Sequence, residues 1–148
     1  MALTTEVAIR KMGEGHIPAV VVLCDAYFPD ARLDRDEIRR RIANGMTYFV
    51  AEVGRELVGF VDVKLRERDA FMNGIAVAPK FEGRGIGTLL LQKAIGFARK
   101  NGKIAIELVV KESNARAVRF YTSNGFAIRR AKPGKTGGVL VLWKGIEN

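Results

Sequence analysis

Cysteine and histidine are nearly absent from this 148-residue sequence, which holds one of each, Cys24 and His16. One cysteine excludes an internal disulfide and a multi-cysteine zinc site, and one histidine excludes a histidine-rich metal cluster. The longest apolar runs, such as Ile17–Cys24, are far shorter than the ~20 residues that span a bilayer. Since the first residues also lack an apolar signal region, we expect a cytoplasmic protein without a metal or a membrane segment.

The composition is that of a folded domain. Hydrophobic residues make up 48% and charged residues 28% of the chain, which is too apolar for a disordered protein. We therefore expect a single domain over residues 1–148, a length near the common domain size. Cys24 lies on an apolar helical stripe and is predicted to be in the core, whereas His16 belongs to the turn before that helix.

The positive charge is concentrated in one stretch. The net charge is +9, from 25 basic and 16 acidic side chains. Residues 93–135 hold eleven lysines or arginines and only two acids, so they carry the whole excess. A clustered positive field attracts anions, and nucleic acid, a phosphorylated cofactor and an acidic protein are all candidate partners. A solvated surface that keeps the protein soluble is the alternative explanation.

Hydrophobic periodicity predicts a mixed fold. Seven segments have the composition or alternation of strands: Glu6–Met12, Thr47–Val53, Glu56–Leu65, Ala70–Val77, Ile104–Val110, Phe126–Arg130 and Val139–Lys144. Four have helical spacing: Ile17–Phe28, Leu33–Asn44, Ile86–Ala98 and Asn114–Asn124. The third helix is expected to bury the stripe Ile86, Leu89, Leu90, Lys93, Ala94, Phe97 and Ala98.

The order of these segments predicts the fold class. The strand–helix–strand unit in the middle predicts a right-handed crossover and a parallel pair, Ala70–Val77 beside Ile104–Val110. The flanking hairpins predict antiparallel strands. We therefore expect an α+β protein, an α/β/α sandwich with a mixed, mostly antiparallel sheet and flanking helices.

A glycine-rich loop connects the predicted strand Ala70–Val77 to the start of the third predicted helix. Gly83, Gly85 and Gly87 alternate there, where glycine permits positive φ and leaves no Cβ beside a ligand. The amides that open a helix bind anions, which makes a pyrophosphate the expected guest. The dinucleotide fingerprint needs a glycine where this chain has Thr88, and no P-loop Gly-Lys is present. A flexible turn is the alternative.

Two motifs carry a resemblance to a known family. The residues Ile75–Pro79 and Glu82–Leu90 resemble the acetyl-CoA motif of the GNAT superfamily of N-acetyltransferases. The residues Asn114–Phe126 are similar to a second family pattern, N-x-x-A-x-x-[hydrophobic]-Y-x-x-x-G-F. Both occur in the family's order. Glu82 departs from the pattern, because the family usually has Arg or Gln there; this carboxylate is expected to point to solvent or to pair with Arg84.

The resemblance implies a cofactor site. The central parallel strands would splay apart, and the pantetheine arm of acetyl-CoA would pair with the backbone of Ile75, Ala76 and Val77. The pyrophosphate would lie on the loop residues Gly83, Arg84, Gly85, Ile86, Gly87 and Thr88. The side chain of Arg84 either adds charge there or is plain surface. From the second motif, the cofactor contacts would be Asn114, Ala117, Phe120 and Tyr121. Asn114 is also a candidate helix cap.

The resemblance also points to catalytic groups. Tyr121 matches the family's general acid, and a phenol near the sulfur can protonate or stabilise the departing thiolate. Glu107 interrupts an apolar strand and is the leading general base; Asp69 and Asp62 follow, and water is a further alternative. In some relatives the glutamate lies two residues later, where this chain has Val109.

These observations predict an N-acetyltransferase that moves acetyl from acetyl-CoA to a primary amine of a small molecule or a protein. The absence of a His/Cys pair at nucleophilic spacing favours direct attack over an acyl-enzyme. The turn Tyr27–Asp30 and the loop Pro133–Gly138 are the expected acceptor walls. The alternatives are a CoA-binding regulator without turnover and a basic nucleic-acid-binding module. We expect no nucleic-acid partner, and a homodimer is left open.

Overall fold

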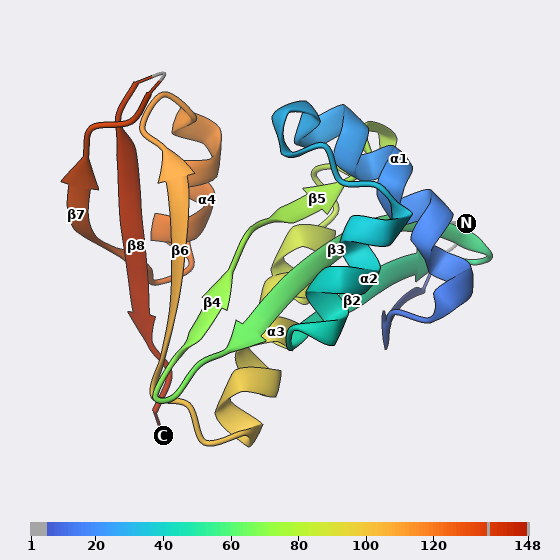
Figure 1. Ribbon diagram of the computed structural model, residues 1–148, viewed down its shortest axis with the longest axis horizontal. Helices are drawn as coiled ribbons and strands as arrows, with labels where there is room; N and C mark the ends of the chain where they lie inside the picture. Colours follow the sequence, from blue (N-terminus) through green and yellow to red (C-terminus); the bar gives the residue numbers. More distant parts are fainter. Residues whose placement is uncertain (1–5, 136, 148) are drawn as a thin grey trace, which may run out of the picture. The chain divides into compact units, whose positions relative to one another are not determined.

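The computed structural model describes residues 6–135 and 137–147. Its strands are β1 (Val7–Lys11), β2 (Met46–Val53), β3 (Glu56–Leu65), β4 (Ala70–Met72), β5 (Ile75–Val77), β6 (Ala105–Lys111), β7 (Ala127–Lys132) and β8 (Val139–Gly145). Its α-helices are α1 (Ile17–Tyr27), α2 (Arg35–Ala43), α3 (Ile86–Lys100) and α4 (Ala115–Ser123). Single 3₁₀ turns are η1 (Glu14–His16), η2 (Pro29–Ala31) and η3 (Pro79–Phe81). The chain path is drawn in Figure 1.

The chain forms two compact units. Unit 1 contains the residues up to Val63 together with Gly74–Ala94, and unit 2 contains Lys64–Asn73 together with Ile95 and the residues after it. Strand β3 and helix α3 each continue from one unit into the other. Within the described residues, hydrogen-bonded neighbours follow the order β1-β2-β3-β4-β6-β8-β7, and β5 pairs with β3. The predicted mixed, mostly antiparallel sheet is confirmed.

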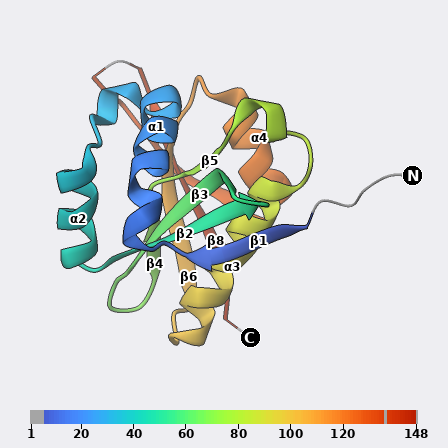
Figure 2. The same cartoon turned by 90° about the vertical axis from the view of Figure 1, so that its right-hand side faces the viewer.

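Unit 1 has helices on both faces of its strands. β1 pairs with β2 and β5 pairs with β3, both antiparallel. Helices α1 and α2 lie on one face of β2 and β3, and the first turns of α3 lie on the other (Figures 1 and 2). The core between the two helices and the strands is apolar, and it includes Ile17, Val20, Cys24, Ile38, Tyr48, Val50 and Phe60. Burying this surface supplies the main stabilisation of the unit.

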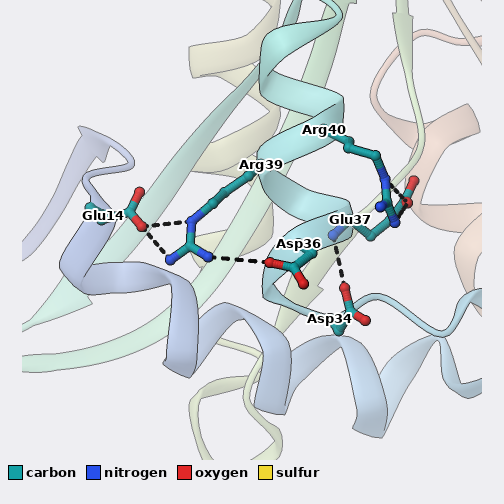
Figure 3. A network of polar contacts seen from close by, with 6 residues as sticks. All are labelled: Glu14, Asp34, Asp36, Glu37, Arg39 and Arg40. Atoms are coloured by element: carbon teal, nitrogen blue, oxygen red, sulfur yellow. Dashed lines mark hydrogen bonds and ion pairs between the residues drawn. The ribbon is translucent and has the colours of Figure 1, made fainter.

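Helix α2 begins at Arg35, directly after its capping residue Asp34. The Asp34 Oδ1 atom accepts a hydrogen bond from the Glu37 backbone N–H at 2.8 Å, which satisfies one of the unpaired amides of the first turn. Figure 3 shows the ion pairs around this helix, in which Arg40 contacts Glu37 at 2.7 Å and Arg39 contacts Glu14. Because these pairs are exposed to solvent, each adds little stability.

Unit 2 contains the parallel pair. β4 runs parallel to β6, with Ala70 opposite Ile106 and Met72 opposite Leu108. β6 then pairs antiparallel with β8, and β8 with β7, which contains an irregularity between Ile128 and Arg130. The predicted turn before β8 includes Thr136, which lies outside the described residues.

The predicted strand Ala70–Val77 is wrong as one element, because it is broken at Asn73 and Gly74 into β4 and β5. Only β4 pairs with β6, while β5 pairs with β3. A Cβ built at Gly74 would lie 3.2 Å from the ring of Phe28, so this aromatic side chain approaches the backbone at the break. The break therefore coincides with a tertiary contact that strand propensity does not report.

The buried stripe of α3 differs from the predicted one. Leu89 is 40% exposed, whereas Leu91 and Ile95 are buried together with Leu90 and Ala94. Ile86, Leu90, Ala94 and Ala98 are buried as expected. The buried face extends from them toward Leu91 and Ile95, and not toward Leu89. Periodicity predicts that a helix has an apolar face, and only the packed sheet determines where that face is centred.

Cys24 is fully buried, as predicted. Burial, together with the negative charge of Asp62, raises the pKa of its thiol from 9.0 to about 11. The thiol thus contributes stability below pH 9.0, which is lost as the pH rises through about 11. At pH 8.5 we expect iodoacetamide to alkylate the folded protein at least ~100-fold more slowly than the urea-unfolded protein, because thiolate is scarcer and access is blocked. Equal rates would contradict the burial of this side chain.

Candidate active site

Strand β5 has one hydrogen-bonding edge that does not face β3. Gly59 lies opposite Val77 in the antiparallel pair, and the Ala78 N–H donates to the Val58 carbonyl at 2.7 Å. Because backbone groups alternate in direction along an antiparallel strand, the N–H and C=O groups of Ile75 and Val77 point to the opposite edge. The Ile75 groups and the Val77 N–H on this edge are suited to pair with an extended amide chain, while the Val77 carbonyl contacts the Tyr27 hydroxyl.

The glycine loop leads from β5 into α3. Gly83 and Gly85 have φ values of 77° and 81°, a region that residues with a side chain adopt rarely. The Leu89 N–H donates to the Gly85 carbonyl at 3.1 Å, so the amides of Ile86, Gly87 and Thr88 precede the helical hydrogen bonds. A Cβ built at Gly83 or Gly85 would meet no described heavy atom within 4 Å, so this side of the loop is open.

Two cations lie beside the loop. The guanidinium of Arg84 is 5.1 Å from the centre of the Phe81 ring, and the Lys80 ammonium is 5.5 Å from the same ring. Lys80 also lies 3.5 Å from the Glu56 carboxylate, so it is chiefly Arg84 and the positive end of the α3 dipole that favour an anion at this position. The loop therefore has the donors and the charge that a diphosphate requires.

Tyr27, which the sequence placed at the end of the first helix and in an acceptor wall, contacts both β5 and the residue before the glycine loop. The hydroxyl of Tyr27 lies within hydrogen-bonding distance of two acceptors, the Val77 carbonyl and, at 2.6 Å, Oε1 of Glu82, which share its single proton. Sequence spacing contains no signal for this contact, because Tyr27 is 50 residues from Val77.

In unit 2, helix α4 positions the second motif. Asn114 caps the helix as predicted, with its Oδ1 accepting from the Ala117 N–H at 3.1 Å. Tyr121 is 6% exposed. Its ring meets those of Phe120 and Phe126 edge-on, with centroids 5.2 Å and 5.5 Å away. Aromatic packing thus fixes the ring of Tyr121, and the role of its hydroxyl stays a prediction.

The Glu107 carboxylate lies between two guanidinium groups. Its side chain is 15% exposed, with Oε1 3.4 Å from Nη2 of Arg66 and Oε2 4.0 Å from Nη1 of Arg129. Arg66 also makes two hydrogen bonds to Asp69, at 2.7 Å and 2.6 Å. These hydrogen bonds hold the pKa of Asp69 below its usual range, so Asp69 is a poorer proton acceptor than an isolated aspartate. Sequence reasoning missed both arginines.

The remaining carboxylate candidate is less accessible. Asp62 is 2% exposed in unit 1, and its charge contributes, after burial itself, to the raised pKa of both Cys24 and Tyr48. A carboxylate that is enclosed in this way is unsuited to meet an incoming amine. Val109, the alternative register position in β6, is 40% exposed.

An open pocket of about 310 Å³ lies beside Asp69 in unit 2. Its lining residues are Arg68, Asp69, Ile104, Ala105, Arg129 and Trp143. The Arg129 guanidinium is 5.6 Å from the Trp143 ring centre, so one wall is cationic and aromatic. In the described part of the chain, no group of three or more His, Cys, Asp or Glu side chains is arranged to hold a metal ion. No helix within residues 6–135 and 137–147 is both long and apolar enough to cross a membrane.

Comparison with known proteins gives the same relationship from sequence and from fold. The family described as "Acetyltransferase (GNAT) family" matches residues 17–126. An uncharacterized N-acetyltransferase of Methanocaldococcus jannaschii is 42% identical over 87 residues, which is 53% of this chain and 38% of that protein. The chain spans less than two thirds of the length of the first curated relatives that it matches.

Solved structures share the fold over nearly the whole chain. The ribosomal-protein-S18-alanine N-acetyltransferase of Escherichia coli has a TM-score of 0.84 and 21% identity, covering 97% of this chain and 96% of that one. The PaiA N-acetyltransferase of Thermoplasma acidophilum, solved with coenzyme A, has a TM-score of 0.78 and 17% identity, covering 95% and 99%. With a family match over well more than half of its residues, this chain belongs to the acetyltransferase (GNAT) family.

Proposed function

We propose that the protein transfers an acetyl group from acetyl-CoA to a primary amine. The observation that carries the proposal is one continuous segment of unit 1, in which the outward edge of β5 is followed by the positive-φ glycines and the open amides of α3. The β5 edge suits the pantetheine amides, and the loop amides of Gly83–Thr88 suit the diphosphate. Membership of the acetyltransferase family and a solved structure of the same fold with coenzyme A bound support the same ligand here.

Transfer requires a neutral amine. A lysine-like amine with a pKa of ~10.4 costs about 4.6 kcal/mol to deprotonate at pH 7, so a base that takes its proton lowers the barrier. The nitrogen attacks the thioester carbonyl, the C–S bond breaks, and the sulfur leaves as a thiolate whose thiol pKa is ~8.5. We assign the proton acceptor to Glu107, directly or through water, and the donor to the sulfur to Tyr121.

The role of Glu107 is tested by Glu107→Gln. Glutamine keeps the size and the contact with Arg66 but cannot accept a proton at neutral pH. We expect kcat/KM to fall about 100-fold, and the limb of the pH–rate profile that rises as the base loses its proton to disappear. The comparison variant is Asp69→Asn, for which we expect that limb to persist. An unaltered profile in Glu107→Gln, or a lost limb in Asp69→Asn, would move the role to Asp69 or to water.

Direct binding and turnover measurements test the function itself. Calorimetry with acetyl-CoA, followed by CoA release with a panel of amines, should show binding and then turnover. Binding without turnover on any amine would favour a CoA-binding regulator. Salt-dependent binding of random RNA that acetyl-CoA does not reduce would favour a nucleic-acid-binding module. The latter has little support, because Tyr121 is buried and Phe97 and Phe120 are partly buried instead of being exposed for base stacking.

The remaining assignments are proposals of the same kind. We place the acceptor among small-molecule amines and protein amines; a ribosomal-protein alanine is the acceptor named for the Escherichia coli structure. We propose that both units belong to one catalytic domain, since the family match covers parts of each. Cytoplasmic location stays a prediction of the sequence, and homodimer formation stays untested.

A further inference from the structure

The end of α1 is hydrogen-bonded to both elements of the proposed donor site. Tyr27 is the last residue of α1, and its hydroxyl contacts the Val77 carbonyl of β5 and the carboxylate of Glu82. Val77 lies on the edge proposed for pantetheine, and Glu82 immediately precedes the first glycine of the phosphate loop. One phenol therefore joins the end of α1 to β5 and to the start of the glycine loop, all within unit 1.

The backbone around Tyr27 restricts where its hydroxyl lies. The Phe28 N–H donates to the Cys24 carbonyl at 2.7 Å, which completes the last turn of α1. The Phe28 ring packs against Gly74, the residue before β5. Tyr27 is itself partly buried. The residue after Tyr27 is thus fixed both by the last turn of α1 and by packing on Gly74, which restricts the position of the phenol.

Glu82 is the unfavourable charge of this loop. A carboxylate next to a bound diphosphate raises the free energy of binding, because like charges repel. The partly buried phenol lies 2.6 Å from Oε1, and when its single proton is donated there, the hydrogen bond restrains that carboxylate and spreads its charge. Because the same Tyr27 hydroxyl also contacts the Val77 carbonyl, the Glu82 carboxylate lies on the β5 side of the loop.

We propose that Tyr27 is a positioning residue that restrains the Glu82 carboxylate beside Val77, so that the amides of Gly83–Thr88 remain available to the diphosphate. The inference rests on the proposed function, since it takes coenzyme A as the ligand of the loop. It predicts that the hydroxyl of Tyr27 matters for cofactor affinity only while residue 82 carries a negative charge.

A double-mutant cycle with coenzyme A tests this coupling. We expect Tyr27→Phe to raise the Kd for coenzyme A about tenfold in low salt, and the loss to shrink as salt screens the repulsion. In a Glu82→Gln background, the same Tyr27→Phe change should alter the Kd by less than about twofold. Tyr48→Phe, which removes a second buried phenol from unit 1, is the matched control and should leave the Kd unchanged. Circular dichroism verifies that each variant is folded.

The outcomes separate this inference from the proposed function. An equal loss of affinity in both backgrounds, or a loss that salt does not reduce, would assign Tyr27 a merely structural role and overturn the inference. An unchanged Kd in Tyr27→Phe would do the same. If the unaltered protein does not bind coenzyme A at millimolar concentration, the proposed function itself fails, and the inference fails with it.

Discussion

Replacement of Tyr121 by phenylalanine should lower kcat about 100-fold or more and leave the KM for acetyl-CoA within about twofold. The substitution keeps the ring that packs against Phe120 and Phe126, so the position of α4 and the stability of unit 2 should be retained. Only the hydroxyl is lost. If that hydroxyl donates to the departing thiolate, its loss affects the transition state much more than the bound ground state. Steady-state kinetics with an accepted amine measures both constants.

The matched control for this experiment is again Tyr48→Phe, which removes the hydroxyl of another buried tyrosine. We expect its kcat to equal that of the unaltered protein. Acetyl-CoA binding by calorimetry should be the same in Tyr121→Phe and in the unaltered protein. A Tyr121→Phe variant with full kcat would remove this residue from the mechanism, and one that unfolds would show that the hydroxyl is structural.

Replacement of Gly85 by valine should abolish measurable binding of coenzyme A, with a Kd at least about 100-fold higher. Gly85 has φ of 81°, a conformation that a β-branched residue adopts only under strain of ~1–3 kcal/mol. Relief of that strain turns the amides of Gly85 and Ile86 away from the anion. Charge-assisted hydrogen bonds contribute ~1.5–3 kcal/mol each, so the loss of two accounts for the expected change. Calorimetry measures it.

The control substitution lies just beyond the other end of α3. Gly102, just after α3, has φ of 77°, and a Cβ built there meets no described heavy atom within 4 Å, as at Gly85. Gly85→Val and Gly102→Val should therefore lower the unfolding temperature by similar amounts, but only Gly102→Val should still bind coenzyme A. Normal binding by Gly85→Val would contradict the assignment of the loop. Equal loss of binding in both variants would show that backbone strain in α3, not the lost amides, is responsible.

Much of the fold could be predicted because its signals are local. The extent of β3 and the cap of α4 at Asn114 both follow from residues within or next to one element. The glycine loop is local as well, since alternating glycines before an amphipathic helix are themselves the signal. The burial of Cys24 follows from its place on an apolar stripe. In each case the signal is carried by residues within one segment, so sequence spacing is sufficient for the prediction.

The features that were missed join residues that are far apart in the chain. The break between β4 and β5 accompanies the contact of Phe28 with Gly74, and the restraint of Glu82 comes from Tyr27. The two guanidinium groups around Glu107 come from segments before and after its own strand. None of these contacts alters the hydrophobic pattern of its segment, and therefore none can be read from periodicity.

Residue spacing alone predicts most of the helices and strands, the position of the glycine loop and the family that the motifs resemble, because each of these depends on short stretches of chain. The charge environment of Glu107, the burial of Asp62 and the partner of Glu82 are set by the packing of distant segments. Electrostatic interactions act through space and depend on burial, so they become defined only when distant segments are packed together.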